Sequence, residues 1–322
     1  MIDAASIEEA SDRISDVIRR TPMLSSTTLG DIAGAEVVLK CEMLQRTGSF
    51  KVRGATNRIR TLDPEVRRRG VVTASGGNHA QGVAFAATMA GVRSTIVMPE
   101  RTSRAKVEAT RSYGGEVILH GRDYNAAAAR AHAIEREEGL TYVHAFEDPA
   151  VIAGQGTLGL EVLEECPTVE TIIVPIGGGG LIAGIALAVA HSDVDARVIG
   201  VQAAGADAAS RSVEAGELIE LEAVDTIAEG MATRHIGELT LDIITEHVDH
   251  LVTVSDMTMS RAIHLLLERS KLLTEPAGAA AVAALLEGAI DPAPAEVVVP
   301  VLSGGNLDIG ELPRFLDVGD SS

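Results

Sequence analysis

Residues 171–184 read TIIVPIGGGGLIAG. A β-branched apolar run ends in four consecutive glycines, and an apolar stretch long enough for a helix comes after them. A strand that passes through a tight turn into a helix is the repeating unit of an α/β fold. Glycines in the turn let backbone N–H groups approach an anion, and the helix N-terminus adds partial positive charge. The stretch therefore predicts a sheet with an anion-binding loop at its edge.

The same alternation continues in both directions along the chain. Short β-branched runs predict strands at residues 36–42, 70–74, 94–98, 116–120, 141–144, 171–176, 197–202, 251–254 and 296–302. Stretches between them predict helices at 7–18, from 50, at 79–90, after 99, and at 123–137, 151–165, 181–191, 206–215, 257–272 and 278–286. No internal repeat or long linker interrupts this pattern. We expect an α/β fold with mainly parallel sheets, whose domain boundary lies where the chain crosses between two sheets.

Composition and charge exclude several classes of protein. Of 322 residues, 46% are hydrophobic and 23% are charged, which is enough for a sizeable core. No apolar run reaches the roughly 18 residues of a membrane span, and residues 1–13 (MIDAASIEEASDR) carry acids where a signal peptide has a basic start. The net charge of −19 opposes nucleic acid and anionic membranes as partners. We expect a cytoplasmic protein.

The two cysteines, Cys41 and Cys166, cannot form a disulfide framework. Neither has a second Cys or a His at metal-ligand spacing. We expect both to be inert core thiols in a reducing compartment.

Three glycine-rich loops each follow a predicted strand: residues 75–79 (SGGNH), 177–180 (GGGG) and 303–306 (SGGN). A single loop of this kind is equally well explained as a tight turn, but three of them together favour one bound anionic ligand. The alternative is a dinucleotide site, because Gly178, Gly180 and Ala183 fit the relaxed fingerprint. That site needs an acidic residue at the end of the next strand, where the chain has Gln202.

Only four lysines could anchor an aldehyde cofactor as a Schiff base: Lys40, Lys51, Lys106 and Lys271. Lys40, Lys106 and Lys271 have the sequence context of ordinary surface or helix-end charges. Lys51 follows the loop at residues 45–50 (QRTGSF) and begins a helix, where the helix dipole and close packing favour a lowered pKa. The aromatic side chain of Phe50 could cover a flat ring. Lys51 is therefore the candidate anchor.

Six motifs along the chain resemble one enzyme group. They are SFKVRGA (49–55), SGGNHAQG (75–82), DPAVIAGQGT (148–157), the tetraglycine loop, TEP (274–276) and SGGN (303–306). Their order and spacing are similar to the threonine dehydratase and serine racemase group of the tryptophan-synthase-β-like (fold type II) pyridoxal-phosphate enzymes. The resemblance runs from about residue 21 to residue 312.

The resemblance implies a role for each matching residue. Lys51 would carry the cofactor, Phe50 would cover its ring, and Asn78 would bond its ring hydroxyl. Ser303 would face the pyridine nitrogen, which makes the ring a weak electron sink and suits β-elimination. The further implied contacts are Gly177, Gly178, Gly179 and Gly180 for the phosphate, Glu275 for the cofactor, and Ser75, Gly76 and His79 for the substrate carboxylate.

The implied reaction is β-elimination from L-threonine, and also from L-serine, which gives 2-oxobutanoate or pyruvate and ammonia. Such a lyase acts in isoleucine biosynthesis or threonine catabolism. The alternatives are a serine racemase or a related β-replacement enzyme, and, from another class, a dinucleotide-binding protein without chemistry. Serine racemases carry a second serine directly after the one that matches Ser75, and here that position is Gly76, which has no proton to give.

The resemblance also implies two three-layer α/β domains. Residues 1–69 and 148–322 would form the large domain and residues 70–147 the small one, with the active site in the cleft and no C-terminal regulatory domain. A homodimer or homotetramer is expected. Members of the group often bind a divalent cation through two carboxylates, and here Gln202 and Ala208 stand at those positions, with Asp207 adjacent. We therefore assign no metal ligands. A monovalent or divalent cation is possible, but no residues are assigned to it.

The acidic composition predicts that the protein is adapted to salt. Four of the 27 basic residues are lysine, so the other 23 are arginine, and acids crowd segments such as 161–165. Repulsion between carboxylates acts over about 30 Å in dilute buffer and about 3 Å at molar salt. We expect the thermal unfolding midpoint, measured with saturating cofactor, to be higher in molar potassium chloride than in dilute buffer. An unchanged or lower midpoint would contradict salt adaptation.

Overall fold

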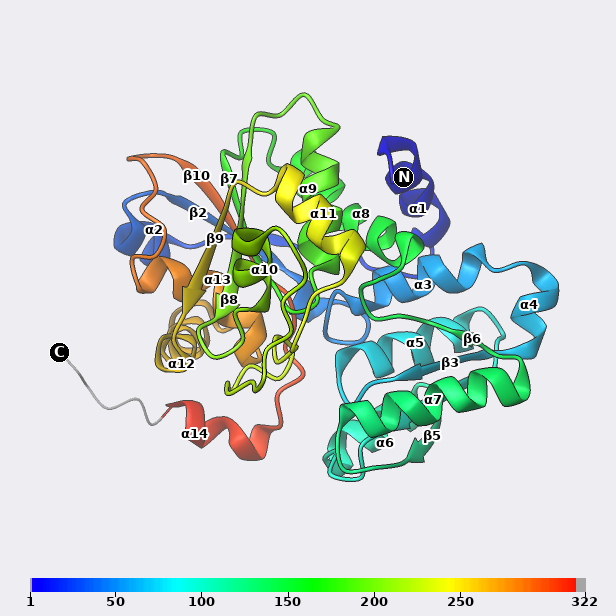
Figure 1. Cartoon of the computed structure of the whole chain (residues 1–322). Coiled ribbons are helices and arrows are strands. Elements are labelled where there is room, and N and C mark those ends of the chain that lie inside the picture. Colours follow the sequence, from blue (N-terminus) through cyan, green and yellow to red (C-terminus); the bar gives the residue numbers. More distant parts are fainter. Residues whose placement is uncertain (1, 317–322) are drawn as a thin grey trace.

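Two sheets organise the chain (Figure 1). The computed structural model describes residues 2–316. In this part of the chain, the larger sheet has the order β1-β2-β10-β7-β8-β9 and the smaller one the order β5-β4-β3-β6. The strands of the larger sheet are β1 (Met23–Ser25), β2 (Glu36–Cys41), β7 (Thr171–Pro175), β8 (Arg197–Ala203), β9 (His250–Val254) and β10 (Val297–Leu302). Those of the smaller sheet are β3 (Val71–Ala74), β4 (Ser94–Met98), β5 (Glu116–Leu119) and β6 (Thr141–Tyr142).

The larger sheet is parallel except at one edge, where β1 pairs antiparallel with β2. Alternate residues of its strands face opposite layers, as the pleat requires. Ile173 packs toward one layer and its neighbour Ile172 toward the other. The first layer contains α2 (Thr27–Ala33), α12 (Asp256–Leu265) and α13 (Pro276–Leu286). The second contains α8 (Pro149–Glu165), α9 (Gly180–Ala190), α10 (Ala208–Ala215) and α11 (Glu238–His247).

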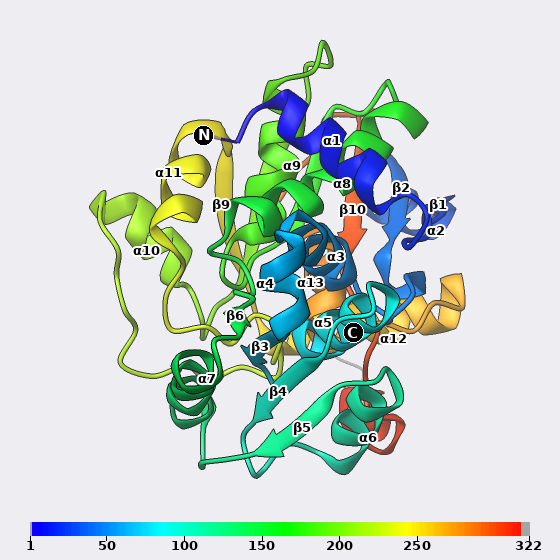
Figure 2. The same cartoon turned by 90° about the vertical axis from the view of Figure 1, so that its right-hand side faces the viewer.

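The smaller sheet is parallel throughout and also lies between two helical layers (Figure 2). Val71 and Ile96 pack toward the layer of α5 (Asn78–Met89) and α6 (Arg104–Ser112), with α3 (Lys51–Thr61) behind it. Val72 and Val97 pack toward α7 (Tyr124–Glu138). The predicted α/β class with two mainly parallel sheets is therefore confirmed. The limits of the small domain at residues 70 and 147 stay a prediction.

Helices α3 and α8 lie at the junction of the two sheets and touch backbone to backbone. A Cβ atom on Gly154 would lie 2.7 Å from Cα of Gly54, so neither position has room for a side chain. Next to them, the backbone N–H of Gly54 donates to Oε1 of Gln155 at 3.1 Å. The chain leaves the larger sheet through α3 and returns through α8, so this contact ties both crossings together.

Several predicted boundaries differ from the structure. The opening helix is α1 (Ala4–Ile14), because Asp3 caps it by accepting the N–H of Ser6. The predicted helix at 257–272 is α12 followed by a π-helical turn (Leu266–Ser270) that ends at Lys271. Elements without a predicted counterpart include β1, α2, α4 (Pro64–Arg69), α11, α14 (Leu312–Leu316) and the 3-10 turns Glu42–Leu44 and Ile309–Glu311.

No helix between residues 2 and 316 combines the length and apolar character needed to cross a membrane. The expectation that a C-terminal regulatory domain is missing concerns the end of the chain, and residues 317–322 lie outside the described part.

Four charged side chains form a buried cluster where α3, α8 and β2 meet. The Arg53 guanidinium pairs with Glu42 and with Glu161, each at 2.7 Å, and Lys40 pairs with Glu161 at 2.7 Å. Arg53, Lys40 and Glu42 have no exposed surface. Two cations and two anions balance, so the cluster holds α8 against α3 and β2 without an unpaired charge. Removing Arg53 would leave the buried Glu42 carboxylate without its ion-pair partner.

We expect Arg53→Met to lower the free energy of unfolding by about 3–5 kcal/mol, because it leaves Glu42 without its ion-pair partner. Arg111→Met is the matched control: Arg111 pairs with Glu108 on the surface, where such a pair contributes about 0–1 kcal/mol. Burial raises the pKa of Glu161, but Arg53 and Lys40 lower it further, so the net pKa lies below the ordinary value.

The contribution of the cluster to the free energy of unfolding is therefore present at pH values above the ordinary carboxyl pKa. It is lost as the pH falls through the lowered pKa of Glu161. Urea unfolding curves at neutral and acidic pH measure both effects. Equal losses for Arg53→Met and Arg111→Met would contradict the account.

Candidate active site

The loop at residues 45–50 pairs directly with the glycine loop at residues 303–306. Ser49 and Gly304 form an antiparallel β-bridge, and the N–H of Phe50 donates to the Ser303 carbonyl at 3.1 Å. Gly48 has a φ of +73°, which favours glycine, and a Cβ there would collide with the side chain of Asn306. The segment that leads into Lys51 is therefore held against the last glycine loop.

The glycine loop at residues 75–79 contacts the loop at 303–306 through Asn78, at the start of α5. Its carbonyl Oδ1 accepts from Nδ2 of Asn306 at 2.8 Å, and its Nδ2 donates to Oε1 of Glu275 at 2.5 Å. The pKa of Glu275 is raised, because the surrounding protein removes water from the carboxyl group, although the Asn78 bond opposes this. Ser303 is buried, and its hydroxyl donates to the Ala277 carbonyl at 3.5 Å. Asn78, Glu275 and Ser303 thus lie together, as the cofactor-binding prediction needs.

Lys51 is the first residue of α3 and lies at this junction. Its Nζ donates to the Ala145 carbonyl at 3.0 Å and lies 5.0 Å from the centre of the Phe50 ring. Loss of water around the amine lowers its pKa to about 8, although the nearby Glu275 charge opposes the shift. The amine is therefore partly neutral near neutral pH and available as a nucleophile or a base.

The tetraglycine loop tolerates no side chain. A Cβ on Gly178 would lie 2.1 Å from the Phe146 ring, one on Gly177 would lie 2.7 Å from the Gly230 carbonyl, and Gly179 has a φ of +92°. Within the described chain, the N–H groups of Gly177, Gly178 and Gly179 donate to no protein acceptor. They precede α9, whose N-terminus adds partial positive charge. The loop can hold a phosphate through its backbone.

These groups fit pyridoxal phosphate. The cofactor needs a primary amine for its aldehyde, an anion cradle for its phosphate and polar partners for its ring, and the site supplies all three. Buried side-chain atoms without a protein partner also gather in its loops, namely Thr47 Oγ1, Ser49 Oγ, His79 Nδ1 and Thr274 Oγ1. The chain's own donors and acceptors therefore match the group.

The predicted substrate loop is partly exposed from Ser75 to Asn78. The Ser75 hydroxyl accepts the N–H of Gly77 at 3.2 Å, and a Cβ on Gly76 would lie 2.9 Å from the Thr102 hydroxyl. His79 Nε2 lies 3.0 Å from the Val143 carbonyl, so this nitrogen carries the proton and donates it there. Burial lowers the pKa of His79 to about 3, which keeps the ring neutral. The ring proton of His79 is therefore already engaged by the Val143 carbonyl.

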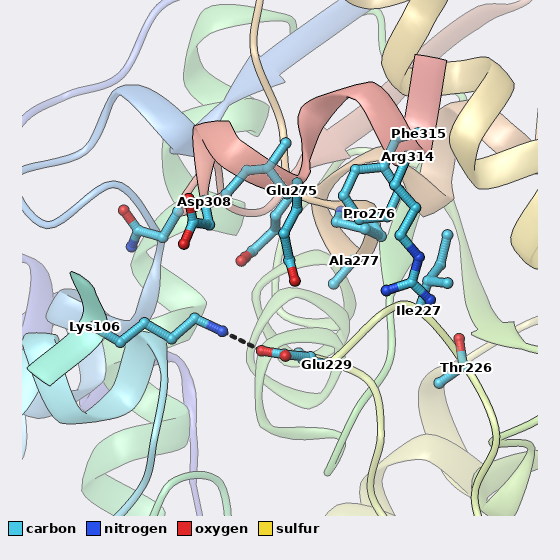
Figure 3. A pocket seen from close by; sticks show the side chains of 14 residues that line it. Lys106, Thr226, Ile227, Glu229, Glu275, Pro276, Ala277, Asp308, Arg314 and Phe315 are labelled. Atoms are coloured by element: carbon cyan, nitrogen blue, oxygen red, sulfur yellow. Dashed lines mark hydrogen bonds and ion pairs between the residues drawn. The ribbon is translucent and has the colours of Figure 1, made fainter. Parts of the chain in front are cut away.

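Glu275 is one of the residues that line a polar cavity of about 130 Å³ (Figure 3). Lys106 of α6 forms an ion pair with Glu229 on its wall, and Asp308 and Arg314 also line it. The pair links the helical layer of the smaller sheet to a loop of the larger part.

The other three lysines are engaged elsewhere. Lys106 has the pair just described, and Lys271 is exposed and follows the π-helical turn. The expectation of a surface role is wrong for Lys40, which is fully buried and donates to Glu161 and to the Thr21 carbonyl. Sequence context misses its burial because a lysine within a strand looks like an edge charge until its partner on α8 is known.

One further expectation changes with the structure. Cys41 is buried, and burial raises the pKa of its thiol to about 12, but Cys166 follows α8 and is partly exposed. The expectation of a core thiol is therefore wrong for Cys166. Gln202 donates to the Ala206 carbonyl and accepts from Ser210, while Asp207 pairs with Arg211.

Sequence reasoning missed the turn at residues 144–147, which contributes the Ala145 carbonyl to Lys51 and the Phe146 ring to the glycine loop. Its position was the available signal. The turn lies at the carboxyl end of the strands of the smaller sheet, where ligands of open α/β sheets bind.

Known proteins resemble the chain over nearly its whole length. The family model described as pyridoxal-phosphate dependent enzyme matches residues 14–304. The L-threonine ammonia-lyase of Geobacter sulfurreducens is 47% identical over 319 residues, which is 99% of this chain and 79% of that one. Maize serine racemase superposes with a TM-score of 0.93 at 37% identity, covering 97% of this chain and 96% of that one.

The processed form of threonine deaminase isoform 2 from Solanum lycopersicum superposes with a TM-score of 0.91 at 34% identity, covering 98% of this chain and 89% of that one. The similarity therefore includes both enzyme types that the motifs suggested. Because the family match extends over most of the sequence and the site supplies an amine, a phosphate cradle and ring partners, the chain belongs to the family of pyridoxal-phosphate-dependent enzymes.

Proposed function

We propose that the chain is a threonine ammonia-lyase. It would eliminate water from L-threonine or L-serine, and water would then hydrolyse the released enamine to 2-oxobutanoate or pyruvate and ammonia. The observation that carries the proposal is the Lys51 amine, held at the Ala145 carbonyl with a pKa of about 8 beside the three glycine loops. The 47% identity to the L-threonine ammonia-lyase of Geobacter sulfurreducens supports the substrate.

Pyridoxal phosphate, when bound, supplies an aldehyde that condenses with amines and a ring that withdraws electrons from the substrate Cα. Lys51 would hold it and then act as the base that removes the α-proton. With a pKa of about 8, roughly one quarter of the amine is neutral at pH 7.5, against roughly one part in a thousand for an ordinary lysine. The Ala145 carbonyl accepts one N–H and so directs the lone pair away from itself.

The remaining predicted residues would bind and orient. Gly177 to Gly180 would hold the phosphate through backbone N–H groups, and Phe50 would cover the ring. Asn78, Glu275 and Ser303 would contact the polar edge of the ring, and Ser75, Gly76 and His79 would bind the substrate carboxylate. These assignments agree with the way the loops converge, and they stay predictions.

Gly76 favours elimination over racemisation. Racemisation needs a proton donor on the face of the substrate opposite Lys51, and Gly76 has no side chain to supply it. The nearby Thr102 hydroxyl leaves only 2.9 Å for a Cβ at position 76, so a serine could be accommodated there only if Thr102 moved. Family membership also removes the alternative of a dinucleotide-binding protein without chemistry.

The finer expectations stay predictions: a cytoplasmic location, a homodimer or homotetramer, salt adaptation, and a place in isoleucine biosynthesis or threonine catabolism. The location and the salt adaptation rest on composition and charge, and the other two rest on the resemblance of the motifs.

Product analysis tests the proposal. Incubation with L-threonine and with L-serine should release 2-oxobutanoate and pyruvate with equimolar ammonia, and D-serine should form far more slowly than pyruvate. Lys51→Ala should lose activity by many orders of magnitude, because it removes both the anchor and the base. Lys271→Ala is the control, since Lys271 is exposed, and it should keep full activity. D-serine forming as fast as pyruvate, or no 2-oxo acid from either substrate, would contradict the proposal.

A further inference from the structure

The turn at residues 144–147 joins β6 to α8 and contacts two reactive parts of the site. The carbonyl of Ala145 accepts from Nζ of Lys51 at 3.0 Å. The ring of Phe146 packs against Gly178, where a Cβ would lie only 2.1 Å from the ring. The conformation of this turn therefore sets the orientation of the amine and one wall of the phosphate cradle.

The last residue of the turn anchors it to a third element. Oε1 of Glu147 accepts the N–H of Leu239 at 2.8 Å, in the first turn of α11. A Cβ on Gly237, the residue before α11, would collide with the same carboxylate. Three consecutive residues thus contact Lys51, the glycine loop and α11.

Nδ1 of His144 forms hydrogen bonds with two backbone N–H groups of the turn. Nδ1 of His144 lies 2.8 Å from the backbone nitrogen of Glu147 and 3.3 Å from that of Phe146. Both backbone nitrogens can only donate, so Nδ1 must accept, and the ring proton must lie on Nε2. The ring is packed against Phe146 in an edge-to-face arrangement, with centres 4.7 Å apart.

The protonation state of His144 agrees with this arrangement. Loss of water around the ring, followed by the charge of Lys51, lowers the pKa of His144 to about 4. The imidazole therefore stays neutral near neutral pH, and its Nδ1 keeps the lone pair that the two N–H groups need.

We propose that His144 is a positioning residue for the reaction, whose Nδ1 holds the turn that presents the Ala145 carbonyl to the Lys51 amine. The inference rests on the proposed function, in which Lys51 holds the cofactor and moves the α-proton. It adds a residue that acts through the backbone of the turn.

Loss of the His144 acceptor should change the orientation of the Lys51 amine more than it changes the binding of substrate. Without the acceptor at Nδ1, the N–H groups of Phe146 and Glu147 lose their hydrogen-bond partner. An open conformation of the turn then becomes more favourable, because water can accept from these N–H groups. The Ala145 carbonyl then no longer directs the amine, so proton transfer becomes slower. The substrate carboxylate site lies on other loops, so KM should change little.

Two substitutions separate the acceptor atom from the rest of the side chain. His144→Asn places an amide oxygen at the position of Nδ1, where it can accept both N–H groups, while His144→Leu removes the acceptor and keeps a similar volume. Because a placed base contributes about 10²–10⁴ to a rate, we expect His144→Leu to lower kcat on L-threonine at least about tenfold, with KM within about threefold. His144→Asn should stay within about threefold of the parent kcat.

A second measurement does not depend on turnover. The full chain is stripped of cofactor and exposed to pyridoxal phosphate for a short, fixed time. Borohydride then traps the product, and peptide mapping measures the label on Lys51. We expect the labelling rate to fall about tenfold in His144→Leu and to be retained in His144→Asn, because amine orientation sets this step too.

The outcomes distinguish this inference from the proposed function. An absence of label on Lys51 in the parent chain would overturn the proposed function. Label and turnover unchanged in a folded His144→Leu variant, or losses in His144→Asn as large as those in His144→Leu, would overturn the role of His144. If His144→Leu does not fold, His144→Gln replaces it, because its acceptor lies one bond further out and cannot accept both N–H groups. Full activity and labelling in His144→Gln would then overturn the inference.

Discussion

The backbone contact between α3 and α8 fixes where the reactive groups lie. Glycines at positions 54 and 154 let the two helices touch, and the buried cluster around Arg53 ties them to β2. Lys51 begins one helix, and the turn at 144–147 leads into the other. The amine and the carbonyl that orients it are therefore placed by the same interface, although 94 positions separate them in the sequence.

This interface also explains how a lysine becomes reactive without a strong charge partner. Lost solvation lowers the pKa of the amine, and the Glu275 charge opposes that shift only in part. The buried cations at Lys40 and Arg53 have carboxylate partners and stay charged. The buried cations Lys40 and Arg53 thus have paired carboxylates, whereas the partly buried Lys51 has the Ala145 carbonyl as its partner.

The sequence predicted most of the features that depend on local patterns and fewer of those that depend on distant partners. The glycine loops and the alternation of strands and helices were visible because backbone geometry restricts residue type. Lys51 became the candidate anchor because it follows the loop at residues 45–50 and begins a helix. The burial of Lys40 was missed because its partner Glu161 lies on another helix. The role of the turn at 144–147 was missed because it depends on backbone atoms, which every residue has. Helix α11 also lacked a predicted counterpart.

The proposed role of Lys51 as the cofactor lysine depends on the lowered pKa of its amine at the start of α3. The direct test is the rate at which the cofactor-free chain takes up a borohydride-trapped pyridoxyl label, followed by peptide mapping from neutral to alkaline pH. Only the neutral amine reacts, so the rate should rise with pH on Lys51, with a midpoint at about 8. A midpoint near the ordinary lysine value of about 10.4, or a label mainly on another lysine, would contradict the account.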